Sequence, residues 1–140
     1  MDEIKLTEER IQEPSWNSTD YTTLTKLAMT LPDEIMKYEK YIMALNRKND
    51  ALDKKIKEME TKVFIEVSAQ KDTYTNQALR DAETANRLKA NTEFKLLNEQ
   101  VADVIFNLHE SKAELERLRN QLRGLEVVVD ILKIKYRVGQ

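Results

Sequence analysis

The sequence predicts an all-α protein built around one long antiparallel coiled-coil helical hairpin, with short helices at its tip and near its N-terminus. Charged residues make up 34% of the 140 residues and aromatic residues only 6%, while Gly and Pro number two each. A chain rich in charge and poor in turn-forming residues is typical of long helices. Two runs of apolar residues with heptad spacing, separated by a polar segment, predict the two arms of the hairpin.

The N-terminal part is expected to be a flexible acidic arm at residues 1–19, followed by a single helical-hairpin domain at residues 20–140. The arm has no apolar period, and residues 14–19 are turn-forming types. Asp20 is a candidate N-cap for a short helix that ends near Pro32. Pro32 is expected to interrupt the helix, because a proline steers the residue before it away from the helical region.

The two long helices are expected at about residues 33–70 and 92–136. In each, core positions recur in alternating steps of three and four residues. The first run comprises Ile35, Tyr38, Ile42, Leu45, Asn49, Leu52, Ile56, Met59 and Val63. The second comprises Phe94, Leu97, Val101, Val104, Leu108, Ser111, Leu115, Leu118, Leu122, Leu125, Val129, Leu132 and Tyr136.

The tip is expected at residues 71–91, where the heptad pattern breaks. Residues 71–76 are mostly polar, and Thr75 or Asn76 is a candidate N-cap for a short helix. Asn91 and Thr92 are candidates for capping the second long helix.

The register of the hairpin is predicted from two polar core residues, Asn49 and Ser111. If they share one layer, Ile35 lies opposite Leu125, and the layers between residues 35 and 63 are otherwise apolar or aromatic on both sides. A slip of one heptad would bury each polar group separately, at a cost of about 1–3 kcal/mol. The polar layer is therefore expected to fix the register.

Apolar residues outside the two heptad runs predict a homo-oligomer, a dimer or higher. They lie near the termini and near the tip, and they need a cover that two helices cannot supply. They are Met36, Tyr41, Met43, Val127, Val128, Ile131 and Ile134, and then Phe64, Ile65, Val67, Leu96, Ile105 and Phe106.

The sequence does not predict an enzyme, a cofactor or a metal site. Cysteine is absent, the one histidine, His109, is expected to face solvent, and no glycine-rich phosphate-binding motif occurs. The first residues lack the pattern of a secretory signal, and no apolar run is long enough to span a membrane. A cytoplasmic protein without membrane contact is expected.

Two groups of basic residues are candidates for binding nucleic acid, although they also fit the solvated face of a coiled coil. Net charge is −2, yet residues 1–20 carry six acidic and two basic residues, and residues 117–140 carry the reverse. The first group is Arg47, Lys48, Lys54 and Lys55, and the second is Arg117, Arg119, Arg123, Lys133, Lys135 and Arg137, with Tyr136 available for base stacking.

The layout of residues 35–137 resembles small helical proteins of bacteriophage recombination modules, including recombination mediators. The features that carry the resemblance are the tip segment at residues 75–80 and the leucine-rich second helix with its basic tail. The resemblance implies an oligomer in the host cytoplasm that binds single-stranded DNA through basic residues. It also implies contact with a recombinase or a single-strand-binding protein in DNA recombination.

Two functional hypotheses therefore compete. The first is a non-catalytic oligomeric adaptor or scaffold that binds another protein, with Trp16 in the acidic arm as a docking residue. The alternative is a mediator that binds single-stranded DNA, in which the arm folds over the basic tail. We expect a deletion of residues 1–19 to abolish partner binding under the first hypothesis and to tighten DNA binding under the second.

Overall fold

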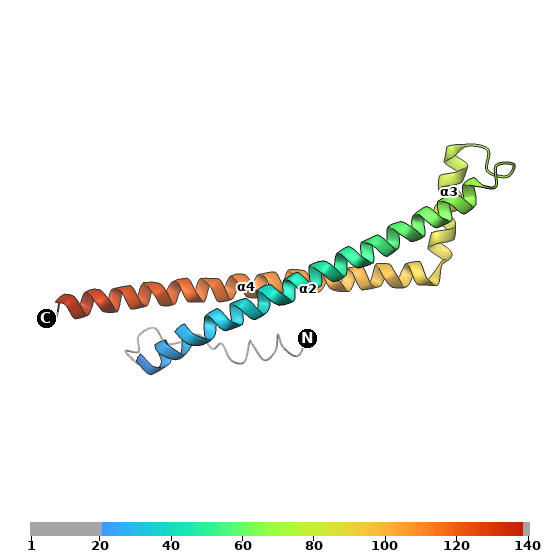
Figure 1. Ribbon diagram of the computed structural model, residues 1–140. Coiled ribbons are helices and arrows are strands. Elements are labelled where there is room, and N and C mark those ends of the chain that lie inside the picture. The colour runs from blue at the N-terminus through green and yellow to red at the C-terminus, as the bar shows by residue number, and fades with distance from the viewer. Residues whose placement is uncertain (1–20, 139–140) are drawn as a thin grey trace. The chain divides into compact units, whose positions relative to one another are not determined.

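The computed structural model describes residues 21–138, and those residues form three α-helices and no strand (Figure 1). The helices are α2 (Tyr21–Ser68), α3 (Gln77–Ala90) and α4 (Thr92–Val138). The predicted all-α class is confirmed for these residues. The acidic arm and Trp16 lie outside the described residues, as do the side chains of Tyr136 and Arg137.

The helix break expected at Pro32 is wrong, because α2 continues through it as one helix of 48 residues. A proline inside a helix removes one backbone hydrogen bond and costs about 3 kcal/mol. Its neighbours Leu31 and Ile35 are both buried in a cluster that includes residues of α4. Burying each such side chain contributes roughly 1.5–3 kcal/mol. Packing on both sides of Pro32 is therefore large enough to offset the lost bond.

Between α2 and α3 the chain turns within eight residues. α2 ends at Ser68, two residues before the expected end, and backbone bonds close the turn from Gln70 N to Val67 O (3.1 Å) and from Tyr74 N to Gln70 O (3.0 Å). Asn76 then caps α3, since its Oδ1 accepts a hydrogen bond from Leu79 N at 2.8 Å. Of the two residues proposed from the sequence, Asn76 is the cap.

A single residue, Asn91, joins α3 to α4 and caps both helices. Its backbone N–H donates to Leu88 O (3.0 Å), and its Oδ1 accepts from Phe94 N (3.1 Å). These bonds satisfy backbone groups that a helix end otherwise leaves without a partner. α4 then runs without a break through Gly124, and no described glycine has a positive φ.

The chain divides into two compact units, one of which joins the start of α2 to the C-terminal part of α4. In its described part, residues 21–43 and 109–138, four residues of α2 form one apolar core with three residues of α4. These are Leu24, Leu31, Ile35 and Tyr38 with Leu115, Leu118 and Leu125. Leu118 is completely buried, so this core lies where the heptad pattern predicts it.

The second unit, residues 44–108, contains the tip. Val63 and Val67 of α2 and Leu88 of α3 form its core, and Tyr74 and Phe94 pack against them. Val67 was expected to be among the apolar residues in need of a partner, but it is completely buried within this unit. The heptad register ends at Val63, and a step of four residues keeps Val67 on the same side of the helix.

Candidate interaction surfaces

The C-terminal part of α4 carries a line of exposed apolar side chains, which we call the outer stripe. Its side chains are those of Val127, Ile131 and Ile134. The half-buried Gly124, which has no side chain, continues the same spacing, so the four positions are separated by three, four and three residues. Val127, Ile131 and Ile134 are 57%, 53% and 61% exposed, whereas Leu125 of the same helix is buried in the core. α4 is therefore apolar both on its packed side and on a side that no described residue covers.

Further exposed apolar side chains lie on α2 in the first unit. Met29, Met36 and Met43 recur every seven residues and are all exposed. That spacing places them on one side of the helix. Tyr41 and Val128, which were expected to need a partner, are instead half-buried.

The second unit exposes apolar residues on each of its helices. On α2 these are Phe64 and Ile65, on α3 Leu79, and on α4 Leu96, Ile105 and Phe106. All but Leu79 were predicted as residues in need of a cover. Phe64 and Ile65 are neighbours in the sequence, as are Ile105 and Phe106, and exposed apolar surface of this kind is typical of protein-binding sites.

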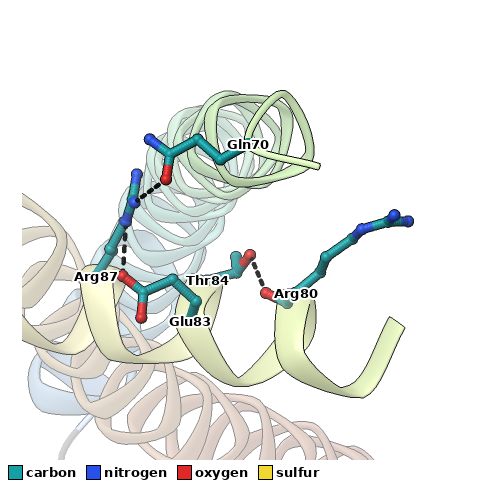
Figure 2. A network of polar contacts seen from close by, with 5 residues as sticks. All are labelled: Gln70, Arg80, Glu83, Thr84 and Arg87. Atoms are coloured by element: carbon teal, nitrogen blue, oxygen red, sulfur yellow. Dashed lines mark hydrogen bonds and ion pairs between the residues drawn. The ribbon is translucent and has the colours of Figure 1, made fainter. Parts of the chain in front are cut away.

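A polar network holds α3 against the turn that precedes it (Figure 2). Arg87 Nε donates to Glu83 Oε1 at 2.9 Å, and Arg87 Nη2 donates to Gln70 Oε1 at 3.3 Å. Arg80 Nε donates to the backbone oxygen of Tyr74 at 3.2 Å. The hydrogen bond to Glu83 raises the pKa of the half-buried Arg87 above its ordinary value. Arg87 therefore links α3 to the preceding turn through its bonds to Glu83 and Gln70.

Three of the C-terminal arginines proposed to bind nucleic acid already have polar partners in the first unit. Arg117 Nε lies 3.1 and 3.0 Å from the carboxylate oxygens of Glu114, and its Nη2 also bonds to that group. Arg119 Nη2 lies 3.3 Å from Glu39 Oε1.

The third arginine, Arg123, donates to Asn120 Oδ1 at 2.9 Å and lies 3.8 Å from Glu116. Lys133 and Lys135 are exposed and form no ion pair with a described residue. The pattern at these arginines favours the interpretation of a solvated, ion-paired helix face.

The other basic group lies on α2 in the second unit and has a different environment. Arg47, Lys48, Lys54 and Lys55 are all exposed, and none forms an ion pair with a described residue. Lys54 lies seven residues after Arg47, and Lys55 lies seven residues after Lys48, so the four form a row two residues wide on one side of α2. Lys62, one further step from Lys55 and also exposed, extends this row and was missed in the sequence. We call these five residues the basic row.

The two residues expected to fix the register lie in different units, so their shared layer stays a prediction. Ser111 is completely buried, and its Oγ has no hydrogen-bond partner among the described residues. Asn49 is half-buried, and its buried Oδ1 likewise makes no hydrogen bond with them.

The described residues were expected to hold no metal site, with His109 facing solvent. His109 is exposed, as predicted, and no group of three or more His, Asp or Glu side chains in this part of the chain is placed to hold a metal ion. A shallow hollow of about 810 Å³ lies on α2 between Asp50 and Glu66, but every residue that lines it belongs to that one helix. Ligand pockets are normally enclosed by several elements.

Among residues 21–138, no helix is long and apolar enough to cross a membrane. Comparison with models of protein families, with curated proteins and with solved structures finds no match for the chain.

Proposed function

We propose that this protein is a non-catalytic, oligomeric coiled-coil adaptor that acts through contacts with other proteins. One observation carries the proposal: large apolar side chains are exposed on both compact units, although each unit has its own buried core. Monomeric soluble proteins rarely expose contiguous apolar surfaces unless these bind something. The outer stripe and the apolar residues around the tip would be the contact surfaces.

We further infer that α2 and α4 pair as an antiparallel coiled-coil hairpin in the register that the sequence predicts. Within the first unit, Glu39 and Arg119 form an ion pair at 3.3 Å. Glu39 directly follows Tyr38, and Arg119 directly follows Leu118. Tyr38 and Leu118 are buried in the same core cluster. In an antiparallel coiled coil, residues at this position flank the seam and face each other. A slip of one heptad would separate this pair, so the ion pair supports the predicted register.

A capture experiment with surface variants tests the adaptor function. Phe106, 61% exposed in the second unit, is changed to Ser, and the exposed polar Gln100 of the same helix is changed to Ser as a matched control. We expect immobilised wild type and Gln100→Ser to retain the same protein from a lysate of the source organism. Phe106→Ser should lose it, because the contact is apolar.

The result is interpreted only for variants whose far-UV circular dichroism matches wild type. If no protein binds saturably to wild type, or if Phe106→Ser and Gln100→Ser bind it equally, the surface is not an adaptor surface. Phe106 contributes little to the core at this exposure, so loss of folding is not the expected cause of a negative result.

A second candidate function, binding of single-stranded DNA, is favoured by the basic row alone. Five cations on one side of α2 without ion pairs among the described residues could follow a phosphate backbone. DNA binding as a recombination accessory, which the resemblance implies, would depend on this row more than on the ion-paired C-terminal arginines.

Fluorescence anisotropy with labelled single-stranded DNA at about 50 and 200 mM salt separates the two functions, because phosphate contacts weaken steeply with salt. The variant Lys54→Glu/Lys55→Glu should abolish binding under the DNA hypothesis. Arg119→Glu, at a cation already paired with Glu39, is the matched control. Absence of binding at the lower salt concentration would leave the adaptor function alone.

A further inference from the structure

We propose that the outer stripe joins copies of this chain, with α4 of one copy parallel to and in register with α4 of another. The inference rests on the proposed oligomeric adaptor and names one of its partners, a second copy. The stripe lies wholly within the first unit, and its three apolar side chains are each more than half exposed.

The spacing of the outer stripe matches that of a coiled-coil seam. Its steps of three, four and three residues are those of the buried seam on the same helix, where Leu118 and Leu125 lie. At this spacing the four positions lie on one face of the helix, as the core positions of a coiled coil do. Gly124 has no side chain to hold a partner backbone away, and Val127, Ile131 and Ile134 present branched side chains at successive layers.

The charges beside the stripe favour a parallel arrangement. Asp130 directly precedes Ile131, Lys135 directly follows Ile134, and both are exposed. In a parallel coiled coil, residues five apart at these flanking positions face each other across the interface. Two copies in register would therefore place Asp130 of each copy opposite Lys135 of the other. An antiparallel arrangement with Ile131 opposite Val127 would bring the two Asp130 carboxylates together.

The copy number of the assembly follows from the shape of the stripe residues. β-Branched residues at both kinds of core position favour three or four strands over two. The stripe covers only about two heptads, so the association should be reversible and depend on concentration. Because parallel helices in register surround one common axis, the assembly is closed and symmetric.

Single cysteines test the arrangement, because the chain has none of its own. Ile131→Cys places the same residue of two copies in one layer if the helices are parallel and in register. Lys133→Cys, exposed and off the stripe, is the matched control. Under mild oxidation we expect Ile131→Cys to form disulfide-linked dimers in at least fivefold higher yield than Lys133→Cys. Equal yields would overturn the proposal.

A disulfide that forms only when Ile131→Cys and Val127→Cys proteins are mixed would show an antiparallel interface and would also overturn it. Charge exchange gives a second readout of orientation. Asp130→Lys should weaken self-association, and Asp130→Lys/Lys135→Asp should restore it, measured by light scattering after size exclusion. Failure of the double variant to restore assembly, when Asp130→Lys has weakened it, contradicts the parallel pairing.

The acidic arm, residues 1–19, is the alternative occupant of the outer stripe. Deleting it distinguishes cover by the arm from cover by a second copy. We expect the deletion to leave the Ile131→Cys yield unchanged, whereas a severalfold increase would mean that the arm occupies the stripe. We also expect Ile131→Ser to raise the dissociation constant by about tenfold or more, which corresponds to about 1.4 kcal/mol. A wild-type protein that is monomeric at every concentration would refute this interface. That result would leave a Phe106-dependent capture of another protein unaffected, so failure of the α4 interface can be told apart from failure of the adaptor function.

Discussion

Ser111 carries a hydroxyl group at a completely buried position of α4, and replacing it by alanine should stabilise the protein. Its Oγ makes no hydrogen bond with a described residue. A buried polar group without a partner costs about 1–3 kcal/mol. Alanine keeps the β-carbon, removes only that oxygen, and has a helix propensity better by roughly 0.5 kcal/mol. The expected gain in the free energy of unfolding is therefore about 2 kcal/mol.

Urea denaturation followed by far-UV circular dichroism measures this gain. With a denaturant slope of roughly 1–3 kcal/mol/M, the midpoint should rise by about 1 M. The exposed Thr61 of α2, changed to alanine, is the control for helix propensity alone and should gain only about 0.5 kcal/mol. Equal slopes for the variants and wild type would show that the change lies in stability and not in the extent of unfolding.

A loss of stability in Ser111→Ala would show that the hydroxyl group has a partner. If Ser111→Ala lowers the free energy of unfolding by 1 kcal/mol or more, the hydroxyl is hydrogen-bonded in solution, and the reasoning above is refuted. Asn49 would then be the first candidate partner, as the heptad pattern predicts. A double-mutant cycle with Asn49→Ala would test that pairing, because only residues in contact give a coupling energy.

Three further substitutions test the fold. Leu118→Ala, at a completely buried residue, should cost about 2–5 kcal/mol in urea denaturation, and a loss below 1 kcal/mol would mean the core is not packed there. Pro32→Ala should restore a backbone bond inside α2 and raise the thermal midpoint, with a gain of up to about 3 kcal/mol; a lowered midpoint would indicate a natural break. Asn76→Ala should cost about 1 kcal/mol by removing the α3 cap, whereas the exposed Gln77→Ala should change stability by less than 0.5 kcal/mol.

Local signals in the sequence predicted the caps at the starts of α3 and α4. Asn76 and Asn91 were identifiable because a side-chain oxygen at the start of a helix satisfies backbone N–H groups nearby. Leu118 and Leu125 were identifiable because a heptad pattern needs only the sequence spacing.

Effects that depend on packing or on distant residues were harder to predict. Pro32 was expected to break α2 because the local rule cannot weigh the burial of Leu31 and Ile35 against the lost bond. The pairing of Arg119 with Glu39 depends on two side chains eighty residues apart in the chain. Arg119 was therefore counted among the candidates for binding nucleic acid, although in the structure it already forms an ion pair with Glu39.

The single-residue junction at Asn91 has a consequence for how this chain can change its length. The backbone N–H of Asn91 ends α3 and its side chain begins α4, so the rotational phase of one helix is locked to that of the other. Each added residue turns a helix by about 100°. One insertion there would rotate Phe94 of α4 away from the core that Leu88 forms with Val63 and Val67, and the junction itself has no loop residue to absorb the rotation. The eight-residue turn before α3 has no such restriction, so insertions and deletions should be tolerated there and rejected at Asn91.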